Sequence, residues 1–277
     1  MEKLFMRSHR LLQTMAFASV FLFSGCENTA DVEPNLNSAI ESNAKGATKT
    51  YYGPETTIGD GTAWVWVQTV QGKPVTLAIE FTEEALVNLS EHEMYDVSLK
   101  LPGQAHATGY KTITMGWNPM GHEPEGVYSL PHFDFHFYMQ TEGQINKIPA
   151  GVDEDAYVLA NKHVLPDIYS FGPVPFAVPQ MGVHWSDVTS PEFQPGGMFT
   201  RTFIYGSHQD RVTFLEPMVT LAHLLSLEVG ESETIAVPSL LLYEDPGYYP
   251  QSYTITHTEH GTYVIALTDL EWHNRNR

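Results

Sequence analysis

The sequence predicts a mainly β protein: one antiparallel β-sandwich or barrel-like domain with two or three short helices. Short runs of β-branched and aromatic residues recur along the chain, and Gly, Pro, Asn and Asp separate them at intervals typical of such folds. Helical periodicity is confined to a few short stretches. Hydrophobic residues make up 42% and aromatic residues 12% of the 277 residues, which is enough to supply a core.

The β runs can be placed along the chain. Residues 62–70 (TAWVWVQTV) are rich in β-branched and aromatic residues. The other runs lie at 75–81, 95–101, 112–117, 133–140, 199–205, 212–215, 252–257 and 262–268. We find no internal repeat and no second linker, so these runs predict one domain.

Three stretches carry helix signals. Residues 82–89 begin with a candidate N-cap, Thr82, followed by two acids. Residues 153–162 are a second candidate. Residues 217–227 (PMVTLAHLLSL) have Pro217 at the first helical position and apolar residues at helical spacing, so we expect a helix to begin there.

Residues 1–25 predict a lipoprotein signal peptide. Three basic residues precede the apolar stretch 11–23, which is too short to span a bilayer comfortably. The following LFSGC resembles the bacterial lipoprotein box, which implies cleavage before Cys26 and acylation of its thiol, as with palmitate. The alternative is an ordinary signal peptide followed by a chance cysteine. We expect the protein in the cell envelope, lipid-anchored to a bacterial membrane and either periplasmic or surface-exposed.

Residues 26–50 predict a lipidated Cys26 followed by a flexible tether. Residues 27–50 contain no aromatic residue and are rich in Asn, Ala, Ser, Thr and Glu. Such a segment has a root-mean-square span of roughly 25–30 Å. The β-rich domain is then expected to cover residues 51–277.

Composition excludes several classes of protein. The chain has 14 Lys+Arg against 33 Asp+Glu, a formal net charge of −19, which argues against electrostatic binding to nucleic acid. One cysteine cannot form an internal disulfide. The membrane, through the lipid anchor, is the expected partner, and a homo-oligomer is a further option; the sequence names no ligand.

The densest region of histidine spans residues 116–138 and ends in PHFDFHFY, residues 131–138. Side chains on a strand alternate between its two faces, so three Phe are expected on one face. The other face then carries His132, Asp134, His136 and Tyr138. Imidazole and carboxylate on one face are metal ligands, and the expected ion is divalent, such as zinc.

Strand geometry limits how these ligands can combine. Residues two apart are about 6.6 Å from each other and residues four apart about 13 Å, so a regular strand favours Asp134 plus one histidine. Further ligands are expected from His184 in MGVHW and Glu216 in FLEPM. Alternatives stay open: Glu216 as the cap of a helix at Pro217, His184 as a hydrogen-bonded core residue, and the whole row as a polar network.

Three more residues are candidates to support a ligand or to replace one. They are His122 and Glu125 in GHEPEG and Tyr138 on the strand itself. His122 is also compatible with a simple surface turn. The remaining histidines we expect to be structural or solvated.

Four blocks together resemble a bacterial family of exported proteins classed as a domain of unknown function. They are GHEP at 121–124, PHFDFHFY at 131–138, MGVHW at 181–185 and FLEPM at 214–218. The resemblance covers roughly residues 52–225. It implies a β-rich secreted domain and supplies no reaction.

Two functions remain open at this point. The first is a metal-binding domain, including a hydrolase or lyase in which Asp134 or Glu216 acts as base. Nucleotide-binding loops and nucleophile elbows are absent from the sequence, so no other enzyme class is indicated. The second is a non-catalytic ligand-binding or self-assembling envelope module, based on the pairs Trp64/Trp66 and Tyr248/Tyr249.

Overall fold

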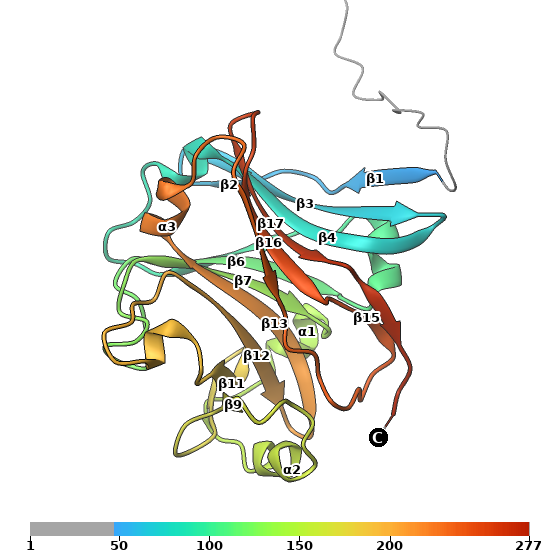
Figure 1. Ribbon diagram of the computed structural model, residues 1–277, viewed down its shortest axis with the longest axis vertical. Helices are drawn as coiled ribbons and strands as arrows, with labels where there is room; N and C mark the ends of the chain where they lie inside the picture. The colour runs from blue at the N-terminus through green and yellow to red at the C-terminus, as the bar shows by residue number, and fades with distance from the viewer. Residues whose placement is uncertain (1–46, 277) are drawn as a thin grey trace, which may run out of the picture. The chain divides into compact units, whose positions relative to one another are not determined.

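Two antiparallel sheets organise residues 47–276, the part of the chain that the computed structural model describes (Figure 1). These residues belong to one compact unit. The first sheet has the order β1 (Thr48–Tyr52), β3 (Gly61–Val70), β4 (Lys73–Thr82), β17 (Thr262–Thr268), β16 (Ser252–His257) and β14 (Ser232–Ala236), with β2 (Thr56–Ile58) beside β3.

The second sheet carries the histidine-rich strand near its middle. Its order is β5 (Tyr95–Leu99), β6 (Thr112–Asn118), β7 (His132–Tyr138), β13 (Arg211–Thr220), β12 (Arg201–His208), β11 (Gly182–Asp187), β10 (Phe176–Val178) and β8 (Gly151–Val152), with β9 (Tyr169–Ser170) beside β11. A separate ribbon pairs β15 (Gly247–Tyr249) with β18 (Glu271–His273).

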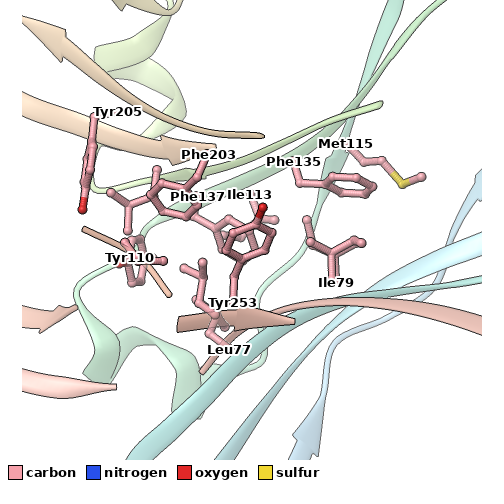
Figure 2. Close-up of a cluster of buried hydrophobic side chains, with 14 of the residues drawn as sticks. Leu77, Ile79, Tyr110, Ile113, Met115, Phe135, Phe137, Phe203, Tyr205 and Tyr253 are labelled. Atoms are coloured by element: carbon pink, nitrogen blue, oxygen red, sulfur yellow. The ribbon is translucent and has the colours of Figure 1, made fainter. Parts of the chain in front are cut away.

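The core lies between the two sheets. Figure 2 shows Leu77 and Ile79 of β4 facing Phe135 and Phe137 of β7. Phe81 stacks on Phe135 with ring centroids 5.8 Å apart. Both sheets are open, so the fold is a β-sandwich rather than a closed barrel, and the expected mainly β class is confirmed.

The helices are short. In the described residues they are α1 (Glu142–Ile145), α2 (Asp155–Asn161) and α3 (Leu221–Ser226), with 3-10 turns η1 (Glu83–Leu86), η2 (Gly103–Thr108) and η3 (Pro191–Phe193). The helix predicted at 153–162 is confirmed as α2, and the one at 82–89 is reduced to η1. No helix in residues 47–276 has the length and apolar character needed to cross a membrane.

The helix predicted to begin at Pro217 is wrong. Strand β13 continues through Pro217 to Thr220, and α3 begins only at Leu221, where the Thr220 hydroxyl accepts the His223 N–H. The pairing of β13 with β7 skips Glu216 and Pro217, as expected where proline has no N–H to donate. Glu216 therefore lies inside a strand and does not cap a helix.

Strand β1 begins inside the predicted tether. Thr48, Lys49 and Thr50 pair with β3, so the first sheet starts before residue 51. These residues alternate polar and β-branched side chains without an apolar run, which is why composition placed them in the tether. The predicted signal peptide, Cys26 and residues 27–46 lie outside the described residues.

Candidate metal centres

The face of the second sheet that points away from the core carries a buried polar row. We call six residues the His/acid row: His122, His132, Asp134, His136, His184 and Glu216. The alternation predicted for β7 is confirmed, since the three Phe belong to the core and every residue of the strand is buried. Apolar clusters flank the row, one around Tyr128 and Met218 and the other around Tyr138 and Phe214.

The row divides into two groups of three. The loop centre consists of His122, His132 and Asp134, and the strand centre consists of His136, His184 and Glu216. Within each group, one ligand atom from each residue lies within 4.8 Å of the other two. The expected convergence of the ligands therefore occurs, but on two points instead of one.

The loop centre is built from neighbouring parts of the chain. His132 and Asp134 lie on β7, and His122 comes from the loop 119–131 that precedes this strand. His132 Nε2 is 3.1 Å from Asp134 Oδ1, and His122 Nε2 is 3.5 Å from Asp134 Oδ2. His122 thus reaches the centre itself and is not a surface turn residue.

Hydrogen bonds fix the orientation of both rings in the loop centre. His122 Nδ1 donates to the Glu123 carbonyl at 2.7 Å, and His132 Nδ1 donates to the Leu130 carbonyl at 2.6 Å. A carbonyl can only accept, so each Nδ1 carries a proton and each Nε2 faces Asp134. Asn118 Nδ2 donates to Asp134 Oδ2 at 2.7 Å and holds that carboxylate. Supports of this kind orient the ligands of metal sites.

The strand centre is built from three strands of the second sheet. Glu216 on β13 lies between the two imidazoles: its Oε1 is 3.4 Å from His136 Nε2 on β7, and its Oε2 is 3.6 Å from His184 Nε2 on β11. His136 and Glu216 are almost completely buried, whereas the His184 side chain is 21% exposed. Solvent therefore reaches this centre from the His184 side.

Phe214 forms an apolar wall for the strand centre. Its ring packs edge-on against His136 at 5.0 Å and against His184 at 5.2 Å. The ring occupies the space beside Gly206, where a Cβ atom would lie 1.9 Å from it. A glycine at 206 thus gives Phe214 its place between the two histidines.

The buried ligand atoms face one another without forming hydrogen bonds. His132 Nε2, His136 Nε2, Asp134 Oδ1 and both Glu216 oxygens have no hydrogen-bond partner. Unpaired buried polar atoms are costly, and each calls for an explanation. Two ligands at about 2.0–2.1 Å from a tetrahedral ion are about 3.3–3.4 Å apart, close to the nitrogen–oxygen separations found here. The atoms of each group are thus close enough to share an ion.

The two carboxyl groups differ in charge state. Burial would raise the pKa of Asp134, but the adjacent His122 and His132 hold it well below its usual range. Burial, together with the nearby charge of Asp134, raises the pKa of Glu216 well above its usual range. Burial also lowers the pKa of His136 and brings that of His184 to about 3. All three shifts favour the neutral forms of the strand-centre residues.

The predicted supporting residues have different outcomes. Tyr138 stacks on His136, with ring centroids 5.2 Å apart and planes within 8°. Glu125 is exposed on the loop, and its backbone N–H bonds to Glu123 Oε2. It belongs to neither of the two groups.

Sequence analysis missed a third acid near the row. Asp96 on β5 is paired with Gly116, which in turn is paired with Asp134. A Cβ atom at Gly116 would lie 2.5 Å from Asp96 Oδ1 and 3.6 Å from Asp134 Cβ, so the Asp96 carboxylate lies over Gly116 toward the row. It interacts electrostatically with His136 and Asp134. Only the pairing of β5 with β6 brings it there.

The aromatic residues of the alternative function do not gather at one surface. Trp66 packs on Ala78, Val264 and Ala266 at the outer face of the first sheet. Tyr248 and Tyr249 line a separate cavity of about 220 Å³ with Tyr110 and Lys111.

No family model, curated protein or solved structure matched this chain. The resemblance to a family of exported proteins stays a prediction. The geometry of the His/acid row therefore carries the functional argument.

Proposed function

We propose that this protein is a bacterial envelope lipoprotein, anchored through acylated Cys26, whose β domain binds a divalent transition-metal ion at the strand centre. One observation carries the metal assignment: the Glu216 oxygens and His136 Nε2 are buried, close together and free of hydrogen bonds. An ion between them would pair all three atoms at once.

The donor set favours zinc or a similar ion. Two imidazole nitrogens and one carboxylate are ligands of zinc and its neighbours in the first transition series, whereas Ca²⁺ and Mg²⁺ prefer oxygen alone. His136 and Glu216 are buried, and a buried carboxylate needs a positive charge beside it. A cation would supply that charge while the imidazole stays neutral. We therefore propose zinc as the first ion to test.

Three protein ligands leave one coordination position for water. Catalytic zinc sites share this count, and a metal there polarises the bound water or a substrate carbonyl. The exposed edge of His184 lies on the side by which water would enter. This supports a hydrolase or lyase as the enzymatic form of the proposal.

Metal content tests the proposal directly. We expect purified full-length protein, after incubation with zinc and desalting, to retain zinc by elemental analysis, and Glu216→Gln and His184→Ala to lose the ion at the strand centre. His163→Gln is the matched control, because His163 also faces a carboxylate, Asp167, but its side chain is 68% exposed. Wild-type protein that retains no zinc above the level of a metal-free reference would contradict the proposal.

Acylation at Cys26 has its own test. We expect wild-type protein to fractionate with membranes and to show a mature mass that begins at Cys26 and includes acyl chains. Cys26→Ser should be released into the soluble fraction without the added mass. An unacylated wild-type chain in the soluble fraction would rule out the anchor and leave the metal proposal unaffected.

A further inference from the structure

The two centres share no ligand and are too far apart along β7 for one ion. His132 and His136 are four residues apart on a regular strand, which separates them by about 13 Å. Asp134 faces His122 and His132, while Glu216 faces His136 and His184. A single ion could therefore contact only one of the two groups.

We propose that His122, His132 and Asp134 form a second metal centre, which holds its own divalent ion of the zinc class while the strand centre holds another. The inference rests on the proposed function, since both centres use the same ligand chemistry. It adds a second ion, a second set of residues and a different exposure to solvent.

Short hydrogen bonds hold the residues of the loop centre in place. Both of its histidines have Nδ1 hydrogen-bonded to a backbone carbonyl, and Asp134 is held by Asn118. His132 Nε2 and Asp134 Oδ1 are 3.1 Å apart, within ion-pair distance but without hydrogen-bond geometry, so both atoms face the same point. The ligands therefore need little rearrangement to bind an ion.

The charges near the row also suit two ions. Three carboxylates, Asp96, Asp134 and Glu216, lie on or beside it. Among the described residues, the ion pairs made by arginine join Arg201 to Glu233 and Arg211 to Asp245, so these cations do not neutralise the row. Two divalent ions would bring four positive charges to three negative ones, with the rest available to bound hydroxide or substrate.

The loop centre should exchange its ion faster than the strand centre. Its ligands lie between residues 122 and 134, and His122 is on a loop with its side chain 28% exposed. Movement of that loop alone would open the site. The strand centre, in contrast, uses strands β7, β11 and β13, which cannot separate without breaking the second sheet.

Counting cobalt ions by titration tests the inference. We expect the full-length metal-free protein to bind two equivalents of Co²⁺, and His122→Ala and His184→Ala to bind one each. The double variant should bind none. His122 is partly exposed on a loop, so its replacement should leave the fold intact, and a thermal melt of each variant checks this.

The outcomes separate this inference from the proposed function. One equivalent in wild type, unchanged in His122→Ala and lost in His184→Ala, would overturn the second centre and leave the strand centre standing. One equivalent lost in both variants would indicate a single shared ion and also overturn the inference. No binding in wild type would contradict the proposed function itself.

Exchange kinetics provide a second readout. With a coloured chelator in excess, wild type should release its two ions in two phases. His122→Ala should lack the fast phase and retain the slow one. A single phase in wild type that His122→Ala leaves unchanged would contradict the assignment of the faster ion to the loop centre.

Discussion

The loop centre and the strand centre contain the same residue types, two histidines and one acid, yet they are assembled in opposite ways. The loop centre needs one strand and the loop before it. The strand centre needs three strands that meet only when the second sheet is complete. The same set of side chains can thus be brought together by neighbouring residues or by distant strands. Only the second arrangement depends on the complete sheet.

The carboxyl groups of the two centres also differ, because their surroundings shift their pKa values in opposite directions. Asp134 is surrounded by His122, His132 and Asn118, so the fold stabilises its ionised form before any ion binds. Glu216 has neither a hydrogen bond nor a cation, so its neutral form is favoured until one arrives. Metal binding should therefore matter more for the stability of the strand centre.

The largest expected effect is the loss of the ion at the strand centre. An ion present at about 1,000 times its Kd stabilises the folded state by about 4 kcal/mol, and for a domain of this size about 1 kcal/mol shifts Tm by about 2–4 °C. We expect Glu216→Gln to lower Tm in zinc by about 10 °C in calorimetry. In chelator the difference should vanish or reverse, because glutamine removes a buried acid. A wild-type Tm that does not respond to zinc would indicate a plain polar network.

Gly206→Ala should disturb the strand centre and spare the loop centre. Its methyl group would overlap the Phe214 ring, and overpacking of this kind costs about 1–3 kcal/mol. We expect a lower denaturation midpoint and loss of one of two bound ions. Gly143→Ala is the control, because a Cβ atom there meets nothing within 4 Å. Equal effects of the two substitutions would argue against Phe214 as the wall of this centre.

Asp96→Asn should weaken both centres to a similar and smaller extent. The change removes one negative charge that acts on His136 and Asp134, which is worth about 1 kcal/mol, or about fivefold in affinity. Isothermal titration with zinc would measure it, with Asp167→Asn as an exposed acidic control. An effect limited to one centre would show that Asp96 belongs to that centre alone.

The smallest effect concerns a histidine–carboxylate pair that does form a hydrogen bond. His257 Nε2 lies 2.7 Å from Glu83 Oε1, in the first sheet and away from the row. Burial would lower the pKa of His257, but bonds to the Leu227 carbonyl and to Glu83 raise it. The charged pair therefore stabilises the fold below about pH 6.5, and this contribution is lost as pH rises through the raised pKa.

Replacing His257 isolates that contribution. We expect the pH-dependent part of the stability loss in His257→Gln to be about 0.2–1 kcal/mol near pH 5.5 and to fade toward pH 8 in urea denaturation. Zinc should not change it. If zinc altered the stability of this variant relative to wild type, the His257–Glu83 pair would also bind zinc. The absence of a hydrogen bond would then not mark a metal centre.

The alternation in residues 132–138 was sufficient to predict which side chains face the core and which form the row. Strand spacing also predicted that Asp134 would pair with one of its two neighbouring histidines, and it pairs with His132. Such local periodicity survives folding because both faces of the strand are packed. The fold class followed from the same alternation repeated along the chain.

What the sequence could not supply was the pairing between strands. Nothing near Asp96 indicates that it will lie opposite Gly116, and the grouping of His184 with Glu216 depends on β11, β12 and β13 being adjacent. Pro217 favoured a helix start by its local preference, but the sheet imposed an extended conformation. His122 was undervalued because a loop residue is positioned by tertiary contacts alone.

The alternation of strand β7 also determines which mutations the protein can tolerate. Its odd positions fill the core and its even positions carry three of the six residues of the His/acid row. A shift by one residue would move the phenylalanines into the row and the polar side chains into the core. Point substitutions in this strand each remove one contribution. Deletion of a single residue would disrupt the packing of the core and the geometry of both centres together. In residues 132–138 the number of residues is therefore more important than the type of any one side chain.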